Sequence, residues 1–251
     1  MFQELQRRID TAKELDFGSI FQRSLDLFKE TWVQGLILTL ISIAITLPLI
    51  MLIYIPMIVY GIADPSAFEQ GDLAALPIFI MAVTLIVVIV IISALSFALQ
   101  AAFFKMIKKI DHKETNEDVN FFMYFKQPYL KKSLILSLAL IGIALVSALL
   151  CYLPLIYAIV PLQFFVLFFA FHPELSISEV IKLSFKLGNK KWLITFGLIL
   201  VAGILAQFVG MLLCFVGVFF TASFGYLPLY HIYKDVIGFD NQPEIFETNS
   251  I

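Results

Sequence analysis

The chain contains long segments without a single charged side chain, and clusters of charged residues separate them. Two of these segments, residues 133–171 and 192–230, are each 39 residues long. As helices that rise 1.5 Å per residue, they would extend roughly 58 Å, about twice the hydrocarbon core of a bilayer. Because basic residues flank both segments, we expect each to cross a membrane and return. The turns are expected near residues 151–154 and between Gly210 and Gly217.

Two shorter uncharged segments, one of them broken by Pro48 and Pro56, are each long enough for a single crossing. The composition also indicates a membrane protein, since 61% hydrophobic residues and a mean hydropathy of +0.94 lie far from the average of soluble proteins. The predicted fold class is all-α. It is a polytopic membrane protein with six transmembrane helices in three hairpin repeats, each preceded by a short amphipathic surface helix. The predicted spans are about residues 32–60, 77–104, 133–151, 154–172, 192–211 and 215–233.

The surface helices are predicted from residues 174–192, a long polar interruption in the last third of the chain. Ser176 and Glu179 have the spacing of a capping box, and the apolar residues after them fall on one helical face. This face comprises Ile177, Val180, Ile181 and Phe185, with Lys182 and Lys186 beside it. Such a helix lies at a membrane surface, here leading into a span that begins at Trp192.

A copy of this segment lies 160 residues earlier. The recurring residues are Asp16 at the cap position, Phe21 and Leu25 on the apolar face, Ser24, and Trp32 at the start of the span. The chain has two tryptophans, and the offset pairs them. Phe121 and Phe125 indicate a weaker third copy at an offset of 100. The pattern therefore predicts internal repetition.

We expect side chains of these segments to anchor the protein at the membrane surface. The predicted anchors are Trp32, Trp192, Phe21, Leu25, Ile181, Phe185, Lys182 and Lys186. The same division makes residues 1–16 an N-terminal amphipathic segment, 17–235 the membrane domain and 236–251 a cytoplasmic tail.

The distribution of basic residues predicts the orientation. Of the 17 Lys and Arg residues, five precede the first span, seven lie in residues 105–132, four lie in 182–191 and one is Lys234. The loop that holds Asp64, Glu69 and Asp72 carries none. Under the positive-inside rule, both termini are cytoplasmic, and the expected location is the cytoplasmic membrane.

The sequence contains no recognisable catalytic constellation, so neither an enzyme nor a cofactor is predicted. Charged residues avoid the middle of every predicted span, where an ionised group is costly and usually functional. Gln100, Gln163 and Gln207 are the most polar side chains within the spans. Hydrogen bonding between helices is the favoured interpretation, and lining a passive pore is the alternative.

The histidines and cysteines fit no metal motif. We expect His112, His172 and His231 near the membrane interface, because their spacing suits neither zinc nor haem. Cys151 and Cys214 are expected to be small buried apolar side chains at outward-facing turns, with oxidation as the alternative. The net charge of −2 argues against a nucleic-acid partner, which calls for a clustered basic surface.

Residues 168–200 combine an apolar span end with the sequence Glu179-Val-Ile-Lys-Leu-Ser-Phe-Lys-Leu-Gly-Asn, and residues 21–28 match part of it. In these features the chain resembles bacterial six-span membrane proteins of unknown function. It also resembles the membrane domain fused to some glycerophosphodiester phosphodiesterases, although the catalytic domain of those enzymes has no counterpart here. Some similar chains carry a carotene-oxygenase name. Such oxygenases hold iron with four histidines, which the 3 histidines of this chain cannot supply.

The leading hypothesis is a non-enzymatic integral membrane protein that organises membrane lipids or partner proteins. The alternative is a transporter or passive channel for an apolar or lipid-like solute, and a membrane enzyme is the weakest hypothesis. A continuous polar cavity between the spans would favour transport, whereas a tightly filled helix bundle would favour the organising role.

Overall fold

The computed structural model describes residues 1–63, 75–114, 119–150, 153–213 and 216–239, and every regular element in these ranges is helical. The all-α prediction is therefore confirmed. In chain order the elements are α1 (Phe2–Thr11), α2 (Phe17–Ala63), α4 (Ala75–Asp111), η1 (Met123–Phe125), α5 (Tyr129–Leu149), α6 (Leu153–Phe171), α7 (Ile177–Lys190), α8 (Trp192–Leu212), α9 (Val216–Thr221), η2 (Ala222–Tyr226) and α10 (Leu227–Val236).

Five helices, α2, α4, α5, α6 and α8, are long and apolar enough to cross a membrane, which identifies a multi-pass membrane protein by length and composition. The sixth predicted span, residues 215–233, is not one helix in the described part of the chain. There α9, η2 and α10 follow one another. Pro228 lies in the first turn of α10 and lacks the N–H that a continuous helix would need at this point.

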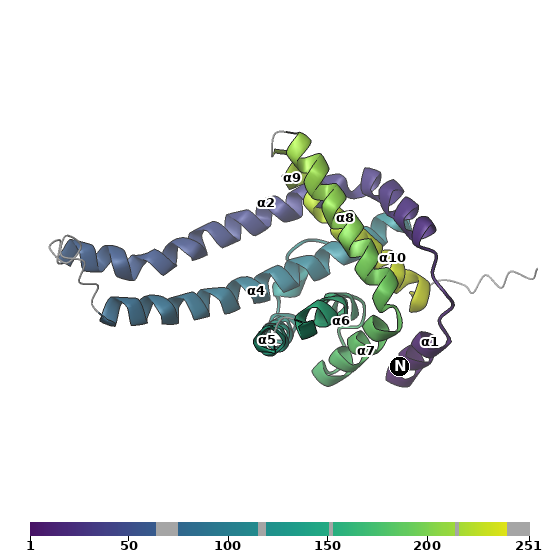
Figure 1. Ribbon diagram of the computed structural model, residues 1–251, viewed down its shortest axis with the longest axis horizontal. Coiled ribbons are helices and arrows are strands. Elements are labelled where there is room, and N and C mark those ends of the chain that lie inside the picture. Colours follow the sequence, from purple (N-terminus) through teal and green to yellow (C-terminus); the bar gives the residue numbers. More distant parts are fainter. Residues whose placement is uncertain (64–74, 115–118, 151–152, 214–215, 240–251) are drawn as a thin grey trace, which may run out of the picture.

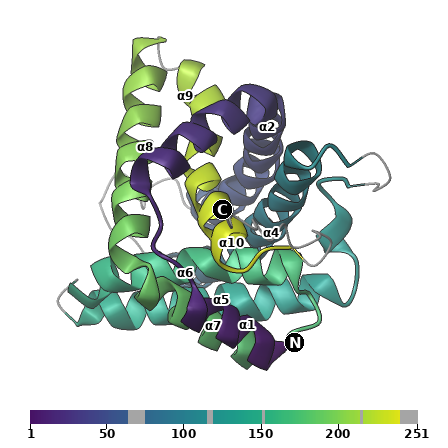
Figure 2. The same ribbon diagram turned by 90° about the vertical axis from the view of Figure 1, so that its right-hand side faces the viewer.

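The long helices form three antiparallel pairs that point in different directions from a shared base. The first pair is α2 with α4, the second is α5 with α6, and the third is α8 with the α9–η2–α10 segment. Figure 1 shows the first pair lengthwise and α5 end-on, whereas Figure 2 shows α5 and α6 lengthwise and α8 upright. The pairs therefore cross one another instead of forming a parallel bundle.

The first pair extends far beyond the rest of the molecule. At 1.5 Å per residue, the 47 residues of α2 cover roughly 70 Å and the 37 residues of α4 roughly 55 Å. Only these two helices reach the far end of the molecule (Figure 1). Large apolar side chains there stay exposed, Met51 by 69% and Ile62 by 76%. An apolar surface of this extent suits hydrocarbon or another apolar partner better than water.

The core lies where the pairs meet. The second half of α4, from Phe97 to Ile107, is buried on most sides, and so is α6 from Val160 to Ala170. Tyr230 and Tyr233 of α10 are fully buried against these two helices and the aromatic ring of Phe171. Aromatic side chains bury large apolar areas, so these contacts hold the three pairs together.

Polar contacts join the pairs at the base. The carboxylate of Asp111, at the end of α4, accepts hydrogen bonds from Tyr230 Oη and Lys234 Nζ of α10, both at 2.6 Å. Arg23 of α2 donates to Asp235 at 2.9 Å. On the other side of the base, Lys186 Nζ of α7 lies 2.6 Å from Asp10 Oδ2, and this ion pair links α1 to α7.

The predicted surface helices have three different outcomes. At residues 177–190 the helix is present as α7, and both hydrogen bonds of the predicted Ser176–Glu179 capping box form. At the first copy there is no separate helix, because α2 runs unbroken from Phe17 through the predicted start of the span at Trp32. Asp16 does occupy the cap position, since its Oδ1 accepts the Ser19 N–H at 2.6 Å.

At the third copy the prediction of an amphipathic helix is wrong. Residues 121–125 form a turn and the short 3-10 helix η1. Asn120 Oδ1 accepts the Phe122 N–H at 3.0 Å, a local bond that competes with helix formation, and Pro128 follows closely. Tyr124 of η1 is nevertheless buried, and its hydroxyl donates to the carbonyl of Ala170 in α6 at 2.6 Å.

Candidate functional site

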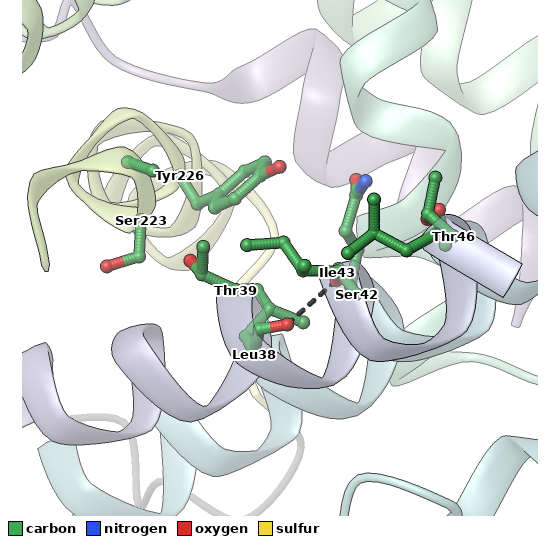
Figure 3. A pocket seen from close by; sticks show the side chains of 11 residues that line it. Leu38, Thr39, Ser42, Ile43, Thr46, Ser223 and Tyr226 are labelled. Carbon is green, nitrogen blue, oxygen red and sulfur yellow. Dashed lines mark hydrogen bonds between the residues drawn. The ribbon is translucent and has the colours of Figure 1, made fainter. Parts of the chain in front are cut away.

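A cleft of about 370 Å³ lies between the first and third helix pairs. Figure 3 shows Thr39, Ser42 and Thr46 along α2, opposite Ser223 and Tyr226 of η2. Ser96 and Gln100 of α4 complete its polar lining. Its volume lies within the range of small-molecule sites, which combine an apolar wall with a few polar groups.

Local bonds within the helix let these hydroxyl groups remain in an apolar segment. Thr39 Oγ1 donates to the carbonyl of Gly35 at 3.0 Å, and Ser42 Oγ donates to the carbonyl of Leu38 at 2.7 Å (Figure 3). A hydroxyl that donates in this way keeps its oxygen lone pairs for another donor. Gly35 also sets the width of the cleft, because a Cβ there would overlap the side chain of Ser223. Its lack of a side chain lets η2 approach α2 closely.

A second cleft of about 410 Å³ lies between α4, α5 and α6. Its polar lining includes Ser93, Ser137 and Gln163. Ser96 and Gln100 line this cleft as well as the first one, so the two clefts adjoin at these side chains. None of the described residues that line either cleft is charged.

The three glutamines singled out in the sequence therefore separate. Gln100 and Gln163 line the clefts, whereas Gln207 is exposed on the surface of α8. Sequence reasoning did not identify the hydroxyl residues beside them. The available signal was spacing, because Ser93, Ser96 and Gln100 recur at three- and four-residue intervals and so share one face of α4.

The two tryptophans occupy different environments. Trp32 is 41% exposed, and its ring lies 5.9 Å from that of Phe220. Trp192 is half-buried, stacks on Phe196 with ring centroids 4.9 Å apart, and donates from Nε1 to the carbonyl of Tyr157 at 3.0 Å. Their role as membrane anchors stays a prediction.

On α2 the predicted anchors Phe21 and Leu25 are half-buried, and the Phe21 ring meets the edge of Phe224 at 6.1 Å. Ile181 and Phe185 of α7 are also half-buried. The deeply buried face of α7 is rotated from the predicted one. It consists of Val180, Leu183, Ser184, Leu187 and Gly188.

The two basic anchors also differ. Lys182 is exposed, as expected of a group directed to water or lipid phosphates. Lys186 is instead directed to Asp10 of α1. In this ion pair the Lys186 side chain is 32% exposed and the Asp10 side chain 60% exposed. It links two segments far apart in the sequence, which the sequence pattern gave no means to predict.

No group of three His, Cys, Asp or Glu side chains in the described ranges is arranged to hold a metal ion. His172 Nδ1 lies 3.4 Å from Glu174, and His231 is buried within α10. Burial lowers the pKa of His112, which favours its neutral form. Cys151 and Cys214, like the loop with Asp64, Glu69 and Asp72, lie outside the described residues.

A scan against protein-family models and searches of curated proteins and of solved structures find no match to this chain. The resemblance to six-span bacterial membrane proteins therefore stays a prediction from residues 168–200 and 21–28.

Proposed function

We propose that the chain is a non-enzymatic integral membrane protein that binds a lipid-like solute between its helix pairs, as a transporter or channel for such solutes does. The observation that carries this proposal is the pair of adjoining clefts that share Ser96 and Gln100. The clefts are largely apolar with a few polar groups, so they favour transport of a lipid-like solute over a tightly filled bundle.

The chemistry of the lining defines the solute class. Apolar residues make up most of the walls, so the solute is largely hydrocarbon. The Gln100 amide offers two donors and an acceptor, and the neighbouring hydroxyls offer acceptors. Because the lining carries no charge, an ion would not be compensated there. An uncharged amphiphile with one or two hydrogen-bonding groups fits best.

The same proposal includes a topology of six spans in three repeated hairpins, with both termini on the cytoplasmic side of a bacterial inner membrane. The distribution of the 17 basic residues supports this orientation, and the α9–η2–α10 segment would provide the last crossing. Matching residues of the two segments that lie 160 positions apart are buried alike, which supports the internal repeat. Ile20 and Ser24 are fully buried, and so are the matching Val180 and Ser184.

Lipid co-purification tests the proposal. The protein is purified in a mild detergent, and bound amphiphiles are extracted and identified by mass spectrometry. A hydrogen bond inside a membrane contributes about 1 kcal/mol, so Gln100→Leu should weaken the affinity for the amphiphile roughly fivefold and lower its occupancy in protein that is not saturated. Gln207→Leu is the matched control, because it makes the same change on the exposed surface of α8 and should leave occupancy unchanged. Equal occupancy in the wild type and both variants, or no bound amphiphile at all, would refute the proposal.

The second candidate is the organising role, in which the protein gathers lipids or partner proteins. The exposed apolar surface of the distal α2–α4 pair favours it, because Met51, Ile62 and Leu76 of that pair are 69%, 76% and 67% exposed. Cross-linking from a photoreactive residue at Met51 would distinguish a protein partner from lipid at this surface.

A further inference from the structure

Lys131 in the first turn of α5 separates two grooves. On one side a groove of about 350 Å³ runs along α4, with Ile91, Leu95 and Leu134 in its wall. On the other side a groove of about 390 Å³ lies against the segment that joins α6 to α7, with Ile135 and Ile177 in its wall. Lys131 lines both grooves.

The positive charge at this point is not neutralised by an ion pair in the described part of the chain. Lys131 is exposed. Its neighbour Lys132 donates to the carbonyls of Pro173 and Leu175. The carboxylates of Glu174 and Glu179 act on the charge of Lys132. Lys131 is therefore the cation that remains for an anionic ligand.

The backbone adds to the attraction for an anion. Lys131 and Lys132 belong to the first turn of a 21-residue helix whose N-cap, Pro128, makes no side-chain cap bond. The N-terminus of a helix carries partial positive charge and N–H groups that favour an anionic ligand. Charge, helix terminus and grooves therefore coincide at one place.

We propose that this place binds an anionic diacyl phospholipid, with its phosphate at Lys131 and one acyl chain in each groove. Two apolar grooves on either side of one basic point match the shape of a molecule with two chains and one charged headgroup. The site is separate from the clefts that share Gln100 and requires only that the protein lies in a membrane. A negative result for the proposed solute would therefore leave this lipid site untouched, and the reverse is also true.

The test uses the purified full-length protein in detergent, titrated with dioleoyl phosphatidylglycerol and followed by native mass spectrometry. Loss of one basic group near an anionic headgroup costs about 1 kcal/mol, so Lys131→Gln should weaken binding roughly fivefold. Lys131→Arg should retain it. Lys13→Gln is the matched control, because Lys13 is exposed between α1 and α2 and lines neither groove.

Three ligand comparisons separate the site from general electrostatic attraction. Dioleoyl phosphatidylcholine, with no net charge, and single-chain lysophosphatidylglycerol should both bind more weakly than the diacyl anionic lipid, and glycerol phosphate should not compete with it. The proposal is wrong if Lys13→Gln weakens binding as much as Lys131→Gln does. It is also wrong if the charged and uncharged diacyl lipids bind alike, or if glycerol phosphate displaces the lipid.

Discussion

Gly188 lies where α7 rests on α6, and an added methyl group there would meet a rigid backbone. A Cβ at this position would lie 2.7 Å from Pro161 Cα and 2.9 Å from Pro161 N and Cγ. A proline ring and its main chain cannot rotate out of the way, so Gly188→Ala must push α7 away from α6. The buried face of α7, which includes Val180 and Leu187, would then lose part of its contact.

Two opposing effects determine how much Gly188→Ala changes the free energy of unfolding. Overpacking in a filled core costs about 1–3 kcal/mol, whereas alanine is favoured over glycine inside a helix by about 1 kcal/mol. Gly203 in α8 provides the matched comparison, because a Cβ there meets no described atom within 4 Å. Gly203→Ala should therefore show the propensity gain alone. The difference between the two variants isolates the steric cost, about 1–3 kcal/mol.

Thermal unfolding of the purified protein in detergent, followed by the loss of the monodisperse peak in gel filtration, measures this difference. For a chain of this size, 1 kcal/mol corresponds to about 2–4 °C in Tm. Gly188→Ala should therefore unfold several degrees below Gly203→Ala. If Gly188→Ala is as stable as Gly203→Ala or more so, the close contact between α6 and α7 is not present in the protein.

Three further predictions concern α7 and the threading of the chain. Val180→Asp should lower the folded yield in membranes more than Ile181→Asp, and Lys182→Ala should leave the yield nearly unchanged. The reason is that Val180 is fully buried, Ile181 half-buried and Lys182 exposed. Equal yields of the three variants in a membrane fraction would contradict this order. The hydrogen bonds from Ser176 lower the pKa of Glu179 in the folded protein. The capping box should therefore stabilise the fold above pH 4.5, the ordinary pKa of a glutamate, and lose this effect as the pH falls through the lower pKa of folded Glu179. Thermal melts between pH 3 and 6 should show a smaller acid loss for Glu179→Gln than for the wild type, and identical pH profiles would count against the box. Cysteine introduced at Ser66, a position outside the described residues, should react with an impermeant thiol reagent from the external side, whereas cysteine at Ser178 should not, and the opposite labelling would invert the proposed orientation.

The sequence by itself determined the helical class and five of the six predicted spans, because a charge-free segment of twenty or more residues satisfies its backbone only as a helix in hydrocarbon. It did not show that the sixth, residues 215–233, is divided among α9, η2 and α10. It also determined the start of α7, since the Ser176–Glu179 box is a local pattern closed by residues three positions apart. Predictions of this kind depend on neighbours along the chain, and the structure agrees with them.

Tertiary structure decided what depends on contacts between distant residues. The buried face of α7 is centred on Leu183 and Leu187, not on Ile181, because α6 approaches from that side and Gly188 permits close contact with Pro161. Segments far apart in the chain also meet where the helix pairs cross and where Lys186 pairs with Asp10. The same holds for the two clefts that Ser96 and Gln100 both line. Periodicity assigns a residue to a face of its own helix, but only packing fixes which partner that face meets.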